Sequence, residues 1–437
     1  MADPAPAASP MPADATILGI QRSEYVAVGW SLLYFFSLLS SYSMLRPVRD
    51  AMAIVGGVSN IKWLFAGTFT VMLLATSAFG WITARYHRRQ FLPWVYYFFI
   101  ANMMIFYALF GYTERAGIDQ VWVSRSFFVW LSVFNLFVVS VFWSFMADIY
   151  TNEQSRRLFG IISAGGSCGA IFGPIITGFL VESVGFRNLL PLSASLLLVA
   201  VFCVFRLRTW VRQRDAETGA APGKPIGGTA IEGMRLTLST PYFRAIAISL
   251  LVANFLGVFF YIYLADLISQ SFADTDEHAK VFSRIDSWIN GLAFASQLLL
   301  VKPVVKRFGV SVSLMILPIV SLIGFVLISI HPVFVVFVVI HVIRRAATFG
   351  FSKPTNDMLY SVVPKKAKYK VKNFIETAVY RGGDLASAWI VTAITALGIS
   401  GGALFCAPFA AVFAGLAYWV GKEYRRRDAA YIIEENK

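Results

Sequence analysis

Apolar residues are arranged in long runs along this chain, and short polar stretches separate them. About twelve runs are long enough to cross a bilayer. They cover residues 25–45, 61–83, 91–113, 121–146, 158–182, 188–207, 243–269, 282–301, 309–330, 332–362, 371–398 and 402–421. A hydrocarbon core of roughly 30 Å needs about 20 apolar residues per helix, because backbone polar groups in lipid must be satisfied within the helix. The pattern therefore predicts about twelve transmembrane helices.

The composition supports the same fold class. Of the 437 residues, 57% are hydrophobic and only 14% are charged, which is too apolar for a soluble protein of this length. We predict an all-α, multi-pass membrane protein whose surrounding partner is the lipid bilayer. The formal net charge is +14, but the basic residues cluster between the apolar runs, so they indicate topology rather than nucleic-acid binding. Their distribution predicts that both termini are cytoplasmic.

One long polar stretch, residues 214–233, divides the predicted helices into six and six. We expect a disordered tail at 1–24, a six-helix bundle at 25–210, a cytoplasmic linker at 211–241, a second bundle at 242–421 and a tail at 422–437. Two such halves describe the major facilitator architecture, in which the substrate site lies between the halves. The tract "GWITARYHRR" (80–89) resembles the loop signature of that superfamily, but it departs from the signature at Ala84 and His87.

Glycines in the fifth apolar run are spaced four residues apart, at Gly165, Gly169 and Gly173. This spacing places them on one stripe of a helix, where the lack of a side chain lets another backbone approach closely. The sequence therefore predicts a helix-packing surface here rather than a substrate site.

Charged residues within the apolar runs need a partner, water or a ligand, because a charge inside a bilayer is costly. Seven candidate cations are Arg46, Arg49, Arg125, Arg344, Arg345, Lys353 and Arg381, and four candidate anions are Asp50, Asp357, Glu376 and Asp384. The surplus of three cations favours a cavity that attracts an anion, since guanidinium groups suit phosphate and carboxylate. Alternatives remain for each group: Arg344 and Arg345 can form packing ion pairs, Arg381 can neutralise Asp384, and Arg46 can belong to an interfacial cluster.

Two segments resemble the ATP/ADP translocases of plastids and intracellular bacteria. The stretch "SMLRPVRDAMAI" resembles the L-R-N-x-K-D motif of that family. The stretch "FSKPTNDMLYSVVPKKAKYKVKNFIETAVYRGGDLASA" resembles its F-D-P-T-K-E-M-A-Y motif and the motifs that follow. Matching positions are Pro354, Thr355, Met358, Tyr360, Lys370, Lys372, Ile375, Arg381 and Gly382. The resemblance implies a bacterial inner-membrane transporter and nucleotide exchange.

The departures from that family concern charge. Arg49 replaces a Lys, Lys353 replaces an Asp, Asn356 replaces a Lys, and Asp384 stands where the family has the Lys of R-L-G-K-S-G. The substrate is therefore expected to be an anion, with a nucleotide as one candidate.

We predict a secondary transporter that works by alternating access, as a monomer, without a cofactor, a metal site or catalytic residues. One alternative is a proton-coupled transporter of another organic solute, a peptide-like molecule or a drug, with Glu376 or Asp384 carrying the proton. Another alternative, from a different class, is a non-transporting membrane sensor.

Overall fold

The first half of the chain forms six long helices. The computed structural model describes residues 20–85, 88–218 and 230–435. The six helices are α1 (Tyr25–Val55), α2 (Ile61–Arg85), α3 (Arg88–Ala116), α4 (Val121–Ile149), α5 (Asn152–Val184) and α6 (Leu189–Thr218). Short 3-10 turns precede α1, α2 and α6, at Arg22–Glu24 (η1), Val58–Asn60 (η2) and Phe186–Asn188 (η3).

The second half has more interruptions. Its elements are α7 (Ala230–Ser239), α8 (Pro241–Ser271), α9 (Thr275–Ser296), η4 (Gln297–Val301), α10 (Lys302–Ile330), α11 (Phe334–Ala347), η5 (Thr348–Ser352), α12 (Lys353–Met358), α13 (Lys365–Phe374), η6 (Ile375–Val379), α14 (Tyr380–Ile394), η7 (Thr395–Leu397) and α15 (Gly398–Glu435). The elements η4, η5 and η6 are single π-helical turns that continue the helices around them.

Twelve membrane crossings follow from these helices. Within the described residues, ten helical segments are long and apolar enough to span a membrane, and two of them, Thr275–Ile330 and Lys370–Ala430, contain 56 and 61 residues. Each of these two is long enough for two crossings. Glycines with positive φ divide them, Gly309 at 81° and Gly398 at 68°, a backbone conformation that favours glycine. The predicted all-α membrane fold is confirmed.

Some predicted boundaries differ from the observed helices. The helix α7 forms inside the predicted linker and packs against α13, and α15 continues to Glu435, beyond the predicted end at residue 421. Residues 1–19, 86–87 and 219–229 lie outside the described structure, and so do the side chains of the loop tract 80–89. The structure therefore does not describe most of the predicted tail at 1–24, the middle of the linker, or the contacts of that tract.

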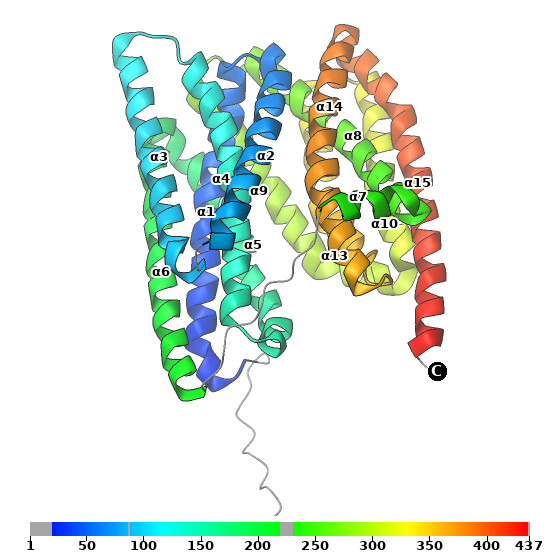
Figure 1. Cartoon of the computed structure of the whole chain (residues 1–437). Coiled ribbons are helices and arrows are strands. Elements are labelled where there is room, and N and C mark those ends of the chain that lie inside the picture. The colour runs from blue at the N-terminus through cyan, green and yellow to red at the C-terminus, as the bar shows by residue number, and fades with distance from the viewer. Residues whose placement is uncertain (1–19, 86–87, 219–229, 436–437) are drawn as a thin grey trace, which may run out of the picture.

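The helices stand side by side as two bundles (Figure 1). The helix α1 packs against α4, α5 and α6, while in the second half α15 packs against α8 and α10, and α14 against α8. We call the end where α1 begins and α15 finishes the terminal end, which is the lower end in Figure 1. The opposite end, which contains the α1–α2 and α8–α9 connections, is called the distal end.

The glycine stripe of α5 packs against α1, as the spacing predicts. A Cβ atom added at Gly165 would lie 2.5 Å from the carbonyl oxygen of Leu32, and one at Gly173 would lie 2.7 Å from Cβ of Ser43. Both distances are too short for a real side chain. The glycines therefore allow α1 and α5 to approach each other closely, and these two helices form the most extensive helix contact in the protein.

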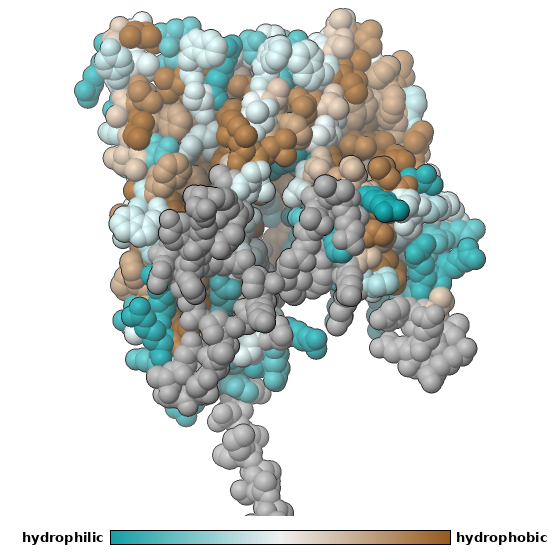
Figure 2. All heavy atoms as spheres, viewed as in Figure 1, coloured by the Kyte–Doolittle hydropathy of each residue, from teal (hydrophilic) through white to brown (hydrophobic). Residues whose placement is uncertain are grey.

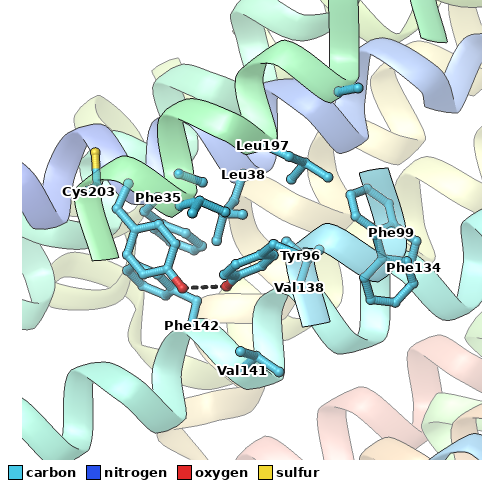
Figure 3. Close-up of a cluster of buried hydrophobic side chains, with 14 of the residues drawn as sticks. Phe35, Leu38, Tyr96, Phe99, Phe134, Val138, Val141, Phe142, Leu197 and Cys203 are labelled. Carbon is cyan, nitrogen blue, oxygen red and sulfur yellow. Dashed lines mark hydrogen bonds between the residues drawn. The ribbon is translucent and has the colours of Figure 1, made fainter. Parts of the chain in front are cut away.

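Aromatic side chains fill the core of the first half (Figure 3). The Phe35 ring stacks on Phe142 with centroids 4.0 Å apart, and the hydroxyls of Tyr34 and Tyr96, both fully buried, are hydrogen-bonded to each other. A buried hydroxyl without a partner is costly, so this hydrogen bond lets two tyrosines occupy an apolar core. The bond joins α1 to α3.

Candidate functional site

A cluster of charged side chains lies between the two halves. It comprises Arg46, Arg49 and Asp50 on α1, Asp286 on α9, Arg345 on α11, and Arg381 and Asp384 on α14. Asp286 and Arg345 each lie eleven residues from the distal start of their helices, which corresponds to a depth of about 16 Å at 1.5 Å per residue. The cluster therefore lies within the membrane-spanning helices, about three turns from their distal ends.

An ion pair within the cluster joins the halves. Nη2 of Arg46 lies 3.3 Å from Oδ1 of Asp286, and the exposed fractions of the two side chains are 14% and 7%. The other oxygen, Oδ2 of Asp286, is buried without a hydrogen-bond partner among the described residues. This carboxylate thus retains capacity to accept a further hydrogen bond.

A second polar connection lies close by. Nη2 of Arg49 lies 2.7 Å from Oδ1 of Asp50, and the Tyr261 hydroxyl of α8 donates a hydrogen bond of 3.0 Å to the same oxygen. The Arg49 guanidinium also lies over the Phe128 ring, 5.0 Å from its centroid. Asp50 is therefore held by one residue from each half.

Arg345 has no such partner. Its Nε is buried without a hydrogen bond, and no salt bridge to Arg345 occurs in the part of the chain that the structure describes. Its guanidinium lies over the ring of Phe349, 5.5 Å from the centroid, and interacts electrostatically with Arg46 and Asp286. The geometry leaves its other N–H donors available to a ligand.

The remaining pair of the cluster is Arg381 and Asp384. Nη1 of Arg381 lies 3.6 Å from Oδ2 of Asp384, and a third of the Arg381 side chain is exposed. The cluster then contains four guanidinium groups and three carboxylates. It carries one excess positive charge, because every aspartate has an arginine partner and Arg345 has none.

The neighbouring Arg344 lies elsewhere, inside the second half. Its Nε donates to the Ser321 hydroxyl at 3.2 Å and its Nη2 to the Ala253 carbonyl at 3.1 Å. Its guanidinium also lies over Phe260, 5.1 Å from the ring centroid, and only 4% of the residue is exposed. Adjacent residues on a helix point about 100° apart, so the two arginines face different surroundings.

Arg125 also lies outside the cluster. Its Nε donates to the carbonyl oxygen of Gly56 at 2.9 Å, where α1 ends, and its guanidinium lies over Trp122. A cation at the C-terminus of a helix interacts favourably with the helix dipole. The structure thus places Arg125 at the distal end of α1.

The other predicted charges form a separate group toward the terminal end. Nζ of Lys372 lies 2.6 Å from Asp357 and 3.7 Å from Glu376, and Lys353 interacts electrostatically with Glu376. About half of the Asp357 and Glu376 side chains is exposed. These residues lie on the same two crossings as Arg345 and Asp384, so charged groups follow both crossings from the terminal end to the cluster.

The two halves contact each other extensively at the distal end. The helix α9 packs against α5 and contacts η3. The bonds between them are Ser283 Oγ to the Pro174 carbonyl at 2.8 Å, Asn290 Nδ2 to the Ala170 carbonyl at 2.8 Å, the Phe186 N–H to Asp276 Oδ1 at 2.7 Å, and an ion pair between Lys280 and Glu182. On the other side, Trp63 of α2 contacts Trp389 of α14 edge to face, with centroids 5.0 Å apart. Figure 2 shows hydrophobic side chains on the outer surface of both halves, with hydrophilic side chains gathered toward the terminal end.

Asp286 was not among the residues selected from the sequence. The predicted span began at residue 282, which placed Asp286 only four residues from the end of a helix. The observed α9 begins at Thr275 and carries Asp286 well into the membrane. A carboxylate within an apolar run is also the feature that identified Asp384. The sequence analysis missed Asp286 because it predicted the start of this helix too late in the chain.

The Major Facilitator Superfamily model matches residues 30–368. The chain belongs to the Major Facilitator Superfamily. It is therefore a multi-pass integral membrane protein with a transporter fold. The chain is also 21% identical over 505 residues to the ADP,ATP carrier protein 2 of Chlamydia pneumoniae, covering 96% of this chain and 93% of that relative. This similarity agrees with the resemblance of the two motifs to ATP/ADP translocases.

Solved structures that share this fold belong to transporters of different kinds. A bacterial homologue of the iron transporter ferroportin, in an inward-facing state, has a TM-score of 0.65 at 13% identity, covering 92% of this chain and 98% of that one. The POT family transporter PepTSo has a TM-score of 0.62 at 12% identity, with 93% and 98% coverage. The nucleoside transporter NupG has 0.59 at 13% identity, with 92% and 99% coverage. At these identities the similarity shows the fold alone.

Proposed function

We propose that this superfamily member is a secondary transporter that exchanges anionic solutes of the nucleotide class by alternating access. The observation that carries the proposal is the unpaired guanidinium of Arg345 between the halves. A partly buried cation that lacks a counterion among the described residues favours an anion in its place, and planar guanidinium groups bind phosphate through paired hydrogen bonds. The near full-length similarity to an ADP,ATP carrier supports phosphate as the chemical group.

Arg345, Arg46 and Arg49 form the proposed phosphate-binding set, with Arg381 nearer the terminal end. Arg46 and Arg49 hold aspartates in this state, and a phosphate group would compete with these aspartates for the guanidinium donors. The carboxylates then neutralise the arginines again when the solute leaves. Arg344, Arg125 and Lys353 stay outside this set, because their contacts place them away from the cluster.

The exchange of one solute for another follows from the same ion pairs. The Arg46–Asp286 pair and the Tyr261–Asp50 hydrogen bond link the two halves, so opening the distal end requires both to break. A bound anion supplies a replacement partner for Arg46 in that transition. Without the anion, the transition would separate opposite charges in a poorly solvated place, which is unfavourable.

The orientation is part of the proposal. The basic tracts predict that both termini lie in the cytoplasm of a bacterium, beside the inner membrane. The state described here, with its distal contacts formed, is then closed on the side away from the cytoplasm.

Counterflow in proteoliposomes tests the proposal. Vesicles that contain the purified protein and unlabelled ADP are offered labelled ATP, and we expect accumulation above that of empty vesicles. Arg345→Gln should reduce this accumulation at least tenfold. Arg115→Gln, which removes an exposed cation of α3 near the distal end, is the matched control and should retain it. The absence of counterflow with nucleotides would exclude the nucleotide class.

Proton coupling is the competing mechanism, and each central carboxylate bears on it. Asp50, Asp286 and Asp384 all lie within 4 Å of a guanidinium group, which favours an ion-pair exchange over a protonation cycle. We therefore expect counterflow to proceed without a pH gradient. An absolute requirement for such a gradient would favour a proton-coupled transporter instead.

A further inference from the structure

Arg284 lies on the outer face of α9, away from the central cluster. It precedes Asp286 by two residues, and two residues on a helix point about 200° apart. Asp286 therefore faces the other half, whereas Arg284 is exposed on the opposite face of the helix. Among the residues of 20–85, 88–218 and 230–435, none forms an ion pair or a hydrogen bond with the Arg284 guanidinium.

Large apolar side chains are exposed beside Arg284. The exposed fraction is 67% for Trp288, one turn further along α9, and 80% for Phe179 of α5, and both residues line a groove that Arg284 also lines. Large apolar side chains on the outer surface of a multi-pass membrane protein contact lipid. Arg284 is thus a cation on a lipid-facing surface.

Two grooves meet at this residue. One has a volume of about 300 Å³ and lies between α9 and α11, where Val338 and Val342 line it. The other has a volume of about 370 Å³ and lies between α5 and α9, where Gly178 and Phe179 line it. Arg284 and Trp288 line both grooves. A single ligand could therefore place a polar group at Arg284 and apolar chains in the grooves beside it.

The depth of Arg284 fits the headgroup boundary. The crossing that starts at Thr275 continues to Phe308 and is about 50 Å long at 1.5 Å per residue. It exceeds a hydrocarbon core of roughly 30 Å by about 10 Å at each end. Arg284 lies nine residues, or about 13 Å, from the start of α9. Its long side chain can therefore reach the phosphate groups of the distal leaflet.

We propose that this groove binds the phosphodiester headgroup of an anionic phospholipid through Arg284. The neighbouring charges Lys280 and Glu182 already neutralise each other as an ion pair across the halves, so Arg284 leaves one uncompensated positive charge. An anionic headgroup supplies the missing counterion, whereas a zwitterionic one brings an extra amine. The acyl chains lie against Trp288 and Phe179.

The lipid would also favour one conformation. The groove between α5 and α9 has walls from both halves, and it exists here with the distal contacts between these helices formed. A ligand shifts a conformational equilibrium by its difference in affinity for the two states. An anionic lipid at Arg284 is therefore expected to stabilise the distally closed state described here.

Thermal unfolding of the delipidated, full-length protein in detergent tests this site. Phosphatidylglycerol is titrated, and the matched ligands are phosphatidylcholine and sodium phosphate. For the unmodified chain we expect phosphatidylglycerol to raise Tm by several degrees and the other two ligands to have little effect, because binding to the folded state alone raises stability. Arg284→Gln should lose most of the shift, and Arg284→Lys should keep part of it.

Arg115→Gln provides the control, since it removes the same charge at the distal end of α3, away from the groove. It should retain the full shift. An equal shift in the unmodified chain and in Arg284→Gln would overturn the site. An equal shift with sodium phosphate would overturn the assignment to a lipid, and one with phosphatidylcholine would overturn the requirement for an anionic headgroup. Because the measurement uses no transported solute, its result is independent of the nucleotide proposal.

Discussion

Arg46 of α1 and Asp286 of α9 form an ion pair across the two halves of the protein, with 3.3 Å between Nη2 and Oδ1. The pair lies within the membrane-spanning helices, yet its partners are 240 residues apart in the sequence. Because both partners belong to the central cluster, the charges of that cluster also hold the two halves together. A change at either residue should therefore affect both stability and conformation.

Removal of Asp286 should be more damaging than removal of both partners. Asp286→Asn leaves Arg46 beside Arg345 without a carboxylate, and we expect a loss of about 2 kcal/mol in the free energy of unfolding. This is below the roughly 3–5 kcal/mol for a fully buried pair, because the Arg46 side chain is 14% exposed. The double variant Arg46→Gln, Asp286→Asn should be more stable than Asp286→Asn alone. Thermal unfolding in detergent measures this, and additive losses would contradict the pairing.

The adjacent arginines of α11 should respond differently to the same substitution. Arg344→Gln removes hydrogen bonds to Ser321 and Ala253 and should lower the free energy of unfolding by about 2 kcal/mol. It should leave the thermal shift caused by ATP, ADP or phosphate intact. Arg345→Gln should abolish that shift with little loss of stability, because Arg345 has no hydrogen-bond or ion-pair partner to lose among the described residues. If Arg344→Gln abolished the ligand-induced thermal shift and Arg345→Gln retained it, the assignment of the two residues would be overturned.

The contact between α1 and α5 should tolerate no added methyl group at Gly165. Gly165→Ala places a Cβ about 2.5 Å from the Leu32 carbonyl oxygen, so the helices must separate, at a cost of about 1–3 kcal/mol. Gly160→Ala on the same helix is the control, since a Cβ there meets nothing within 4 Å and alanine favours the helix by up to about 1 kcal/mol. A comparison of the two melting temperatures checks this. Equal effects would indicate that α1 and α5 are further apart.

The ion pairs of Lys372 should contribute little to stability. Although Nζ of Lys372 lies 2.6 Å from Asp357, about half of the Asp357 side chain is exposed, and exposed pairs contribute about 0–1 kcal/mol. Lys372→Gln should therefore change the free energy of unfolding by less than about 1 kcal/mol. The same melting assay gives the comparison with Asp286→Asn. A loss as large as that of Asp286→Asn would show that the pair is effectively buried.

Much of the fold was predictable because lipid imposes a strong local rule. A run of about 20 apolar residues crosses the hydrocarbon core as a helix, because a helix satisfies its own backbone polar groups. The twelve crossings therefore follow from the apolar runs. The stripe of Gly165, Gly169 and Gly173 was equally predictable, because residues spaced four apart lie on one face of a helix. The identity of their partner, α1, depends on how the helices pack.

The site was only partly predictable. The sequence identified Arg46, Arg49, Arg345, Arg381, Asp50 and Asp384 as membrane-embedded charges, and the structure brings them together. It also identified Arg344 with the same rule, although that residue lies within the second half. The surplus of positive charge falls from three to one for a related reason. Asp286 joins the cluster, whereas the structure places elsewhere Arg125, Arg344, Lys353, Asp357 and Glu376.

The amino-acid sequence by itself determined the helical membrane fold, the two-half organisation and the presence of costly charges in the crossings, because each follows from local hydrophobicity and helix periodicity. Only the tertiary structure decided which charges are partners. The Arg46–Asp286 pair, the isolation of Arg345 and the outward position of Arg284 depend on the rotation and depth of helices distant in sequence. No local pattern encodes those relationships, since an ion pair is set by a few ångströms between side chains from different halves.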